Sequence, residues 1–137
     1  MPGYSGTPLA KKLGFKDDFR VRLINTPADV IIELRDALAK CRISKETARP
    51  LDFIFLFSKS RSEFEAHLKQ AAKALAPAGM LWASWPKKAS GVPTDLSENL
   101  IRQIGLKAGL VDIKVCAVTD VWSGLKFVIP VKDRPKS

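Results

Sequence analysis

The chain has 137 residues, of which 46% are hydrophobic and 27% are charged. The length suits one domain of common size and is too short for two, and the composition excludes a disordered chain. The formal net charge of +9 predicts a surface that attracts anions, such as nucleic acid, phosphorylated metabolites or acidic proteins.

The basic residues are spread along the sequence, so charge alone does not choose among these partners. No block of five like charges occurs, and a solvated surface that promotes solubility explains the pattern equally well. The basic residues nearest the two ends are Lys11, Lys12, Lys16, Arg20, Arg22, Lys132, Arg134 and Lys136.

The sequence shows neither metal-ligand spacing nor a membrane segment. Cys41 and Cys116 lie far apart and His67 is the only histidine, so no metal site is predicted. Both cysteines lie in apolar, β-prone runs, which are typical of buried thiols. No stretch approaches the roughly 20 apolar residues of a membrane span, and the first residues show no apolar leader. We therefore expect a cytoplasmic protein that has no membrane partner.

The first predicted elements are a short helix, a strand and a longer helix. A proline start and a glycine end predict a helix over residues 8–13. Residues 19–25 form a β-prone run, and residues 27–38 carry apolar positions at helical spacing. A short strand is expected at 41–43, followed by a polar connection over 44–50.

Two predicted strands flank an amphipathic helix in the middle of the chain. Residues 51–57 (LDFIFLF) are a nearly continuous apolar run, typical of a parallel strand covered on both faces. Ser60 begins a capping box and a helix that runs to Leu75. The Ala-Pro-Ala-Gly segment at 76–79 ends this helix, and residues 80–85 form the next buried strand.

The last predicted elements are one helix and an antiparallel hairpin. Thr94 or Asp95 is expected to cap a helix that ends near Gly109. Strands at 111–118 and 125–131 follow, and the link between them is short enough for a hairpin.

This order of elements predicts an α/β fold with three layers. Helices that alternate with strands imply a Rossmann-like sheet of about six strands, mostly parallel, which the antiparallel hairpin closes. We expect a single Rossmann-like domain over residues 1–131 and a flexible basic tail at 132–137.

A ligand site is expected beyond the carboxyl ends of the strands, where the strand order reverses. The segments predicted there are rich in hydroxyls, amides and cations, and helix N-termini that open there favour an anion. Helix capping is the favoured explanation for each hydroxyl or amide residue taken singly, and packing is the default explanation for the tryptophans. The candidate ligand-binding residues are Asn25, Thr26, Ser58, Lys59, Ser60, Arg61, Trp85, Lys87, Lys88, Ser90, Gly91, Thr94, Asp95, Trp122 and Ser123.

No catalytic set assembles from the sequence. His67 lies on the predicted amphipathic helix, away from the carboxyl edge of the sheet. Asp95 and Asp120 are the only carboxylates expected near the cleft, and Asp95 is also a candidate cap. We predict no catalytic residue and no metal ligand.

Several motifs resemble those of a small bacterial family catalogued only as a domain of unknown function. They cover nearly the whole chain and are YSGTPLAKKLG at 4–14, WPKKASG at 85–91, TD at 94–95, GLVDIKV at 109–115 and WSGLKF at 122–127. This resemblance implies no known activity.

The order of elements resembles a shortened class I S-adenosylmethionine-dependent methyltransferase. The segment LAPAGMLW at 75–82 is similar to the turn that those enzymes carry before their fifth strand, and the closing hairpin also fits. This resemblance implies a truncated form of that fold, without one helix of the usual pattern between Ile43 and Leu51.

The segment after the first predicted strand departs from that family. Those enzymes carry a glycine-rich loop there, whereas residues 23–29 (LINTPAD) contain no glycine, Pro27 lacks a donor N–H and Ala28 adds a side chain. They also carry an acidic residue after the second strand, where the nearest acid of this chain is Glu46. We therefore predict no cofactor, regard S-adenosylmethionine as doubtful, and favour a protein that is not an enzyme.

Three functions remain open at this point. The first is a non-catalytic module that binds an anionic small molecule, or an acidic or phosphorylated protein partner, at the carboxyl edge of the sheet. The second is a divergent methyltransferase-like transferase, and the third is a protein that binds nucleic acid through its basic surface. The sequence does not indicate the oligomeric state.

Overall fold

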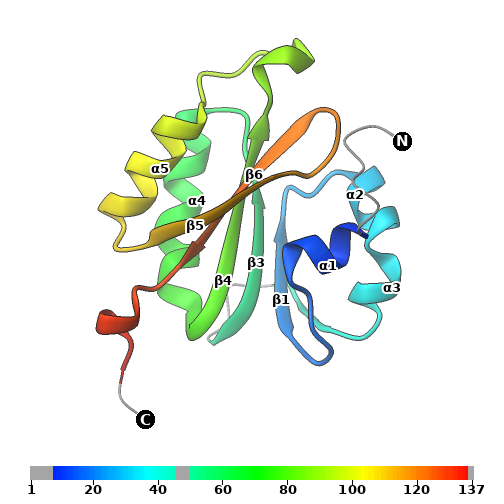
Figure 1. The fold of residues 1–137 in the computed structure, drawn as a ribbon, viewed down its shortest axis with the longest axis vertical. Helices are drawn as coiled ribbons and strands as arrows, with labels where there is room; N and C mark the ends of the chain where they lie inside the picture. Colours follow the sequence, from blue (N-terminus) through cyan, green and yellow to red (C-terminus); the bar gives the residue numbers. More distant parts are fainter. Residues whose placement is uncertain (1–7, 46–49, 136–137) are drawn as a thin grey trace.

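Six strands form one sheet, with helices on both of its faces (Figure 1). The computed structural model describes residues 8–45 and 50–135. The strands are β1 (Arg20–Ile24), β2 (Arg42–Ser44), β3 (Leu51–Phe57), β4 (Leu75–Pro86), β5 (Val111–Ala117) and β6 (Trp122–Val128). The helices are α1 (Leu9–Leu13), α2 (Ala28–Glu33), α3 (Arg35–Leu38), α4 (Arg61–Ala74) and α5 (Glu98–Lys107), with short 3₁₀ turns η1 (Lys88–Ser90) and η2 (Val131–Asp133).

The strand order is β2-β1-β3-β4-β6-β5. The pairs β1–β2, β1–β3 and β3–β4 are parallel, whereas β6 is antiparallel to both β4 and β5. The prediction of a mostly parallel, six-stranded α/β sheet with a closing antiparallel hairpin is therefore confirmed.

The side chains of β3 alternate between two hydrophobic clusters, one on each face of the sheet. Ile54 and Leu56 pack with the cluster of α4 and α5, which includes Phe64 and Ile101. The phenylalanines of the same strand pack on the other face, with residues of α1 and α2 such as Leu13. Because a strand presents successive side chains to opposite faces, the continuous apolar run LDFIFLF builds both clusters.

Two side-chain hydrogen bonds fix the end of α1 and the start of α4. The buried Trp82 Nε1 donates to the Leu13 carbonyl at the end of α1, at 2.8 Å. At the start of α4 the Ser60 hydroxyl accepts from Glu63 N, as the capping box predicts. The Glu63 carboxylate turns back to Lys59 N rather than to the amide of the cap residue.

The boundaries of two helical segments differ from the prediction. The region expected as one helix to Leu38 divides at Leu34, where φ is −94° and ψ is 2°. The last helix is capped by Ser97, whose side chain accepts from Leu100 N, and not by Thr94 or Asp95.

The hairpin and β4 also differ from the prediction. β6 begins at Trp122, opposite Pro86, and ends at Val128, because Pro130 has no N–H with which to continue a ladder. Residues 76–79 are part of β4 and not a break, with a register shift where β4 pairs with β3. Gly79 permits this irregularity, since a Cβ there would lie 2.7 Å from the Leu51 carbonyl oxygen.

The turn η2 lies close to the end of the described residues, and Arg134 Nε, directly after it, donates to the Ile129 carbonyl at 3.0 Å. The flexible tail predicted for residues 132–137 stays a prediction. Within residues 8–45 and 50–135, no helix is both long enough and apolar enough to cross a membrane.

Candidate functional site

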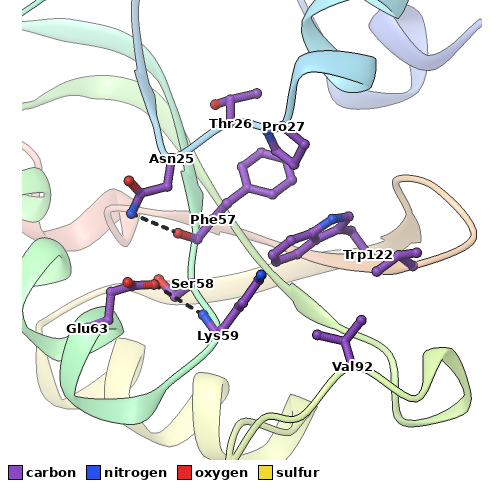
Figure 2. A pocket seen from close by; sticks show the side chains of 10 residues that line it. Asn25, Thr26, Pro27, Phe57, Ser58, Lys59, Glu63, Val92 and Trp122 are labelled. Carbon is purple, nitrogen blue, oxygen red and sulfur yellow. Dashed lines mark hydrogen bonds between the residues drawn. The ribbon is translucent and has the colours of Figure 1, made fainter.

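The strand order reverses at β1, because its neighbours are β2 on one side and β3 on the other. The carboxyl ends of β1 and β3 lie side by side, with Ile24 opposite Leu56. A cavity of about 660 Å³ opens at this edge, within the range of roughly 300–1,000 Å³ typical of ligand sites. The residues that line it are Asn25, Thr26, Pro27, Phe57, Ser58, Lys59, Glu63, Val92, Val121 and Trp122 (Figure 2).

The turn after β1 adopts a backbone conformation that glycine usually supplies. Asn25 directly follows β1 and has a φ of 57°, in the left-handed region. Asparagine tolerates this region better than most residues, because its short polar side chain bonds locally. Its Nδ2 donates to the Phe57 carbonyl at 3.4 Å, a long bond that links the ends of β1 and β3 (Figure 2). The chain therefore makes a sharp turn at the edge of the cavity without a glycine.

Two buried hydroxyls at the cavity wall have no hydrogen-bond partner among the described residues. They are Thr26 Oγ1, beyond β1, and Ser58 Oγ, beyond β3. Ser58 is only 1% exposed, and its amide donates to Ser84 O at 3.0 Å, so its position is fixed by the sheet. A buried polar group without a partner destabilises a fold, and a ligand or an ordered water in the cavity would supply these two hydroxyls with one.

One cation and one anion stand at the mouth of the cavity. The side chain of Lys59 extends towards Trp122, whereas Glu63 approaches from the first turn of α4 (Figure 2). Glu63 Oε1 accepts from Lys59 N at 3.2 Å, which leaves the Lys59 ammonium group on a separate side of the opening. The cavity can therefore hold a molecule that carries both charges.

Apolar groups form the remaining wall. The rings of Phe57 and Trp122 meet edge to face, with centroids 5.0 Å apart and an interplanar angle of 77°. Both side chains are buried, and the lining includes Val92 and Val121. This wall can exclude water and receive an apolar or aromatic part of a ligand.

The structure brings five of the predicted residues together at the cavity: Asn25, Thr26, Ser58, Lys59 and Trp122. Their role in binding stays a prediction. The predicted residues that do not line the cavity are Ser60, Arg61, Trp85, Lys87, Lys88, Ser90, Gly91, Thr94, Asp95 and Ser123.

Several of these residues have structural partners. Trp85 is 5% exposed and belongs to the hydrophobic cluster under α4 and α5. Asp95 Oδ1 accepts from Arg61 N at 2.7 Å, so it caps α4 rather than α5. The Thr94 hydroxyl donates to the Lys59 carbonyl and accepts from Leu96 N.

The loop that carries the paired lysines is held mostly by its own bonds. Lys87 N donates to Val121 O at 2.7 Å, and the Ser90 hydroxyl donates to Lys87 O at 2.6 Å. Only Val92 of this loop lines the cavity. The loop therefore packs an apolar residue over the opening, and its lysines do not line the cavity.

The residues that the sequence analysis missed are Pro27, Phe57, Glu63, Val92 and Val121. Glu63 was detectable, because the capping box places it in the first turn of a helix that begins beside Ser58. The apolar members carry no such signal, since they look like ordinary core residues in the sequence.

The described residues contain no group of three His, Cys, Asp or Glu that could hold a metal ion. Both cysteines are half-buried, and burial raises the pKa of the Cys41 and Cys116 thiols. Neither thiol is activated as a nucleophile by this environment.

The fold is that of class I methyltransferases. Similar solved structures include an S-adenosylmethionine (SAM) dependent methyltransferase from Aquifex aeolicus, with a TM-score of 0.62, 17% identity and 88% of each chain covered. Precorrin-6y C5,15-methyltransferase from Geobacter metallireducens has a TM-score of 0.59 at 12% identity, covering 88% of this chain and 85% of the other. Magnesium protoporphyrin IX methyltransferase from Synechocystis PCC 6803, with bound SAH, has a TM-score of 0.57 at 11% identity, covering 88% of this chain and 78% of the other.

No family model matches this chain, and no curated protein matches it. The resemblance to an uncharacterised bacterial family therefore stays a prediction, whereas the resemblance to a class I methyltransferase core is confirmed at the level of the fold.

The prediction of no cofactor, with SAM as doubtful, is wrong in the light of these structures. The Synechocystis enzyme of the same fold is known with SAH and with SAM bound. The prediction relied on the missing glycines after the first strand. A cavity nevertheless opens beside this turn, where Asn25 adopts a left-handed conformation and Pro27 lines the wall, so the missing glycines do not close the site. Glu46, the nearest acid after the second predicted strand, lies outside the described residues.

Proposed function

We propose that this chain binds SAM in the cavity between the ends of β1 and β3 and acts as a methyltransferase. The observation that carries the proposal is the position of the cavity, at the reversal of strand order in a class I methyltransferase fold. The similar structures support the fold and not the residues, so the side chains of this chain must themselves fit SAM.

The cavity fits the parts of SAM. SAM combines a zwitterionic amino-acid end with a cationic sulfur and an aromatic base, and this wall offers matching groups. Lys59 and Glu63 can pair with the carboxylate and ammonium of the amino-acid end. The unpartnered Thr26 and Ser58 hydroxyls can bond its polar atoms, and Trp122 can contact the base.

The sulfonium of bound SAM supplies an electrophilic methyl group. The residues of the chain would bind and orient the reactants at the end of β3 and exclude water from them. Phe57 and Trp122 form the wall that keeps water out.

Isothermal titration calorimetry with SAM and SAH tests the proposal, with thermal unfolding as a second readout. At a hundred times its dissociation constant, a ligand stabilises the fold by about 2.7 kcal/mol. The double variant Thr26→Val/Ser58→Ala should weaken SAM binding about tenfold without lowering stability, because each change removes a hydroxyl that has no internal bond among the described residues.

Ser62→Ala is the matched control, since Ser62 is exposed on α4 and does not line the cavity. This variant should bind SAM as the parent chain does. If neither SAM nor SAH binds at millimolar concentration, the proposal fails.

A further inference from the structure

The fold gathers lysines that are far apart in the sequence. Lys12 and Lys16 come from α1 and the segment after it, whereas Lys114 and Lys126 face each other across the β5–β6 hairpin. Lys114 Nζ donates to the Lys12 carbonyl at 3.2 Å, and Lys12 Nζ donates to the Ala117 carbonyl at 3.4 Å. We call these four residues the α1 lysine surface.

Lys126 completes this surface beside the end of α1. A Cβ placed on Gly14 would lie 4.0 Å from Lys126 Nζ, so this ammonium group reaches the C-terminus of α1. Lys126 is opposite Trp82 on β4, whose indole bonds to Leu13 of the same helix. The surface therefore lies on the face of the sheet that carries α1, on the side of the hairpin.

These four lysines have no carboxylate partner among the described residues. The ion pairs of the described chain all belong to arginines, namely Arg20, Arg61 and Arg102. Like charges that lie directly opposite across two strands, as Lys114 and Lys126 do, destabilise a sheet. Burial lowers the pKa of Lys126, and the nearby Lys114 and Lys16 lower it further. An anion bound at this surface would relieve the repulsion between the lysines.

An extended polyanion can contact more of these lysines than a single phosphate can, because they are spread over α1, the segment after it and both strands of the hairpin. A single-stranded nucleic-acid backbone carries one negative charge per nucleotide and can bend to follow such a surface, and each neutralised phosphate releases a counterion. No aromatic side chain of the described residues is exposed to stack on bases, so the contact would be with phosphates only.

We propose that the α1 lysine surface binds the phosphate backbone of single-stranded RNA without preference for sequence. This inference does not rest on methyl transfer, and the site is separate from the cavity, because none of the four lysines lines the cavity.

Fluorescence anisotropy with a labelled 20-nucleotide poly(U) RNA, between 50 and 200 mM KCl, tests the proposal. The variant Lys16→Gln/Lys114→Gln/Lys126→Gln should bind at least tenfold more weakly at 100 mM KCl. It should also lower the slope of log affinity against log salt by about 2, because each lost phosphate contact in a single strand contributes about 0.7. An RNA of mixed sequence should bind within a few-fold of poly(U).

Lys69→Gln/Lys73→Gln/Lys107→Gln is the matched control. It removes three exposed lysines from α4 and α5, on the opposite face, and also takes the net charge from +9 to +6. This variant should lose less than threefold in affinity and keep the parent slope.

Three results would overturn the proposal: no binding of RNA by the parent chain, equal losses in the two triple variants, or binding to phosphatidylserine vesicles without binding to RNA. If the first triple variant does not fold, the single change Lys114→Gln at an exposed position gives the same test. The slope should then fall by about 0.7, and an unchanged slope would refute the assignment.

Discussion

Two buried serines on neighbouring strands should respond in opposite ways to replacement by alanine. Ser58 and Ser84 are each 1% exposed, and Ser58 N bonds to Ser84 O. The Ser84 hydroxyl donates to the Ser123 carbonyl at 2.6 Å, whereas the Ser58 hydroxyl has no partner among the described residues. The pair therefore compares a satisfied hydroxyl with an unsatisfied one at equal burial.

The expected magnitudes follow from these contacts. Ser84→Ala loses a buried hydrogen bond and should lower the free energy of unfolding by about 1 kcal/mol. Ser58→Ala removes a buried group that has no compensating bond, whose burial disfavours folding by about 1–3 kcal/mol, and loses a little packing. It should therefore raise the free energy of unfolding by up to about 1 kcal/mol.

Urea unfolding of the parent and both variants, without added ligand, measures this difference. The m-value should stay constant, so that the change in midpoint reports stability alone. In thermal unfolding the two variants should differ by up to roughly 8 °C, since 1 kcal/mol shifts the midpoint of a domain of this size by about 4 °C. If Ser58→Ala is destabilised as much as Ser84→Ala, the Ser58 hydroxyl has a partner inside the protein, and its proposed role in the cavity loses support.

Substitutions at three further positions test the roles given to single residues. Asn25→Ala should lower the free energy of unfolding by about 1 kcal/mol, because alanine is strained at a φ of 57°. Asn25→Gly should be nearly neutral. Equal losses of stability in the two variants, measured by urea unfolding, would contradict this reasoning. Gly105→Ala on α5 should destabilise by about 1–3 kcal/mol despite the better helix propensity of alanine, since its Cβ would overlap the Phe127 ring; a stabilised variant would show that the ring moves aside freely. The pKa of Lys126 is lowered, so in the window between this lowered pKa and 10.5 the unfolded chain binds more protons and stability should rise with pH. Lys126→Met should remove that rise, measured by urea unfolding at pH 7.5 and 10. At pH 7.5 the variant should also be more stable than the parent by about 0.5 kcal/mol, because the repulsion with Lys114 is lost. An unchanged pH dependence would mean that another group causes it.

Local signals predicted most of the fold. The run LDFIFLF was predicted correctly as β3, because a short, nearly continuous apolar run rich in phenylalanine is typical of a strand covered on both faces. The start of β6 was misplaced, since its first residue is decided by the pairing of Trp122 with Pro86 and not by its own sequence. Boundaries that depend on a partner strand cannot be read from one segment alone.

The candidate site residues were likewise predicted correctly in part. Asn25, Thr26 and Ser58 were selected by the rule that ligands bind at the carboxyl ends of strands around the reversal of order, and all three line the cavity. Lys87 and Lys88 were selected for charge and loop length, and neither lines it, because their loop bonds to itself and to Val121. Topology was the better guide to position, and charge was a poor one.

The lysine surface could not have been predicted in this way, because its members come from opposite ends of the chain. Lys12 and Lys114 meet through a bond across 102 residues, and Lys126 joins them only through the register of the hairpin. A spread of basic residues in a sequence is therefore compatible with a compact basic surface in the fold.

The cavity and this surface also differ in chemistry. The cavity pairs one cation with one anion and a wall of apolar groups, whereas the surface has cations alone. Salt should distinguish them: ligand binding in the cavity should change little between 50 and 200 mM KCl, whereas RNA binding should weaken steeply, because only the latter releases several counterions.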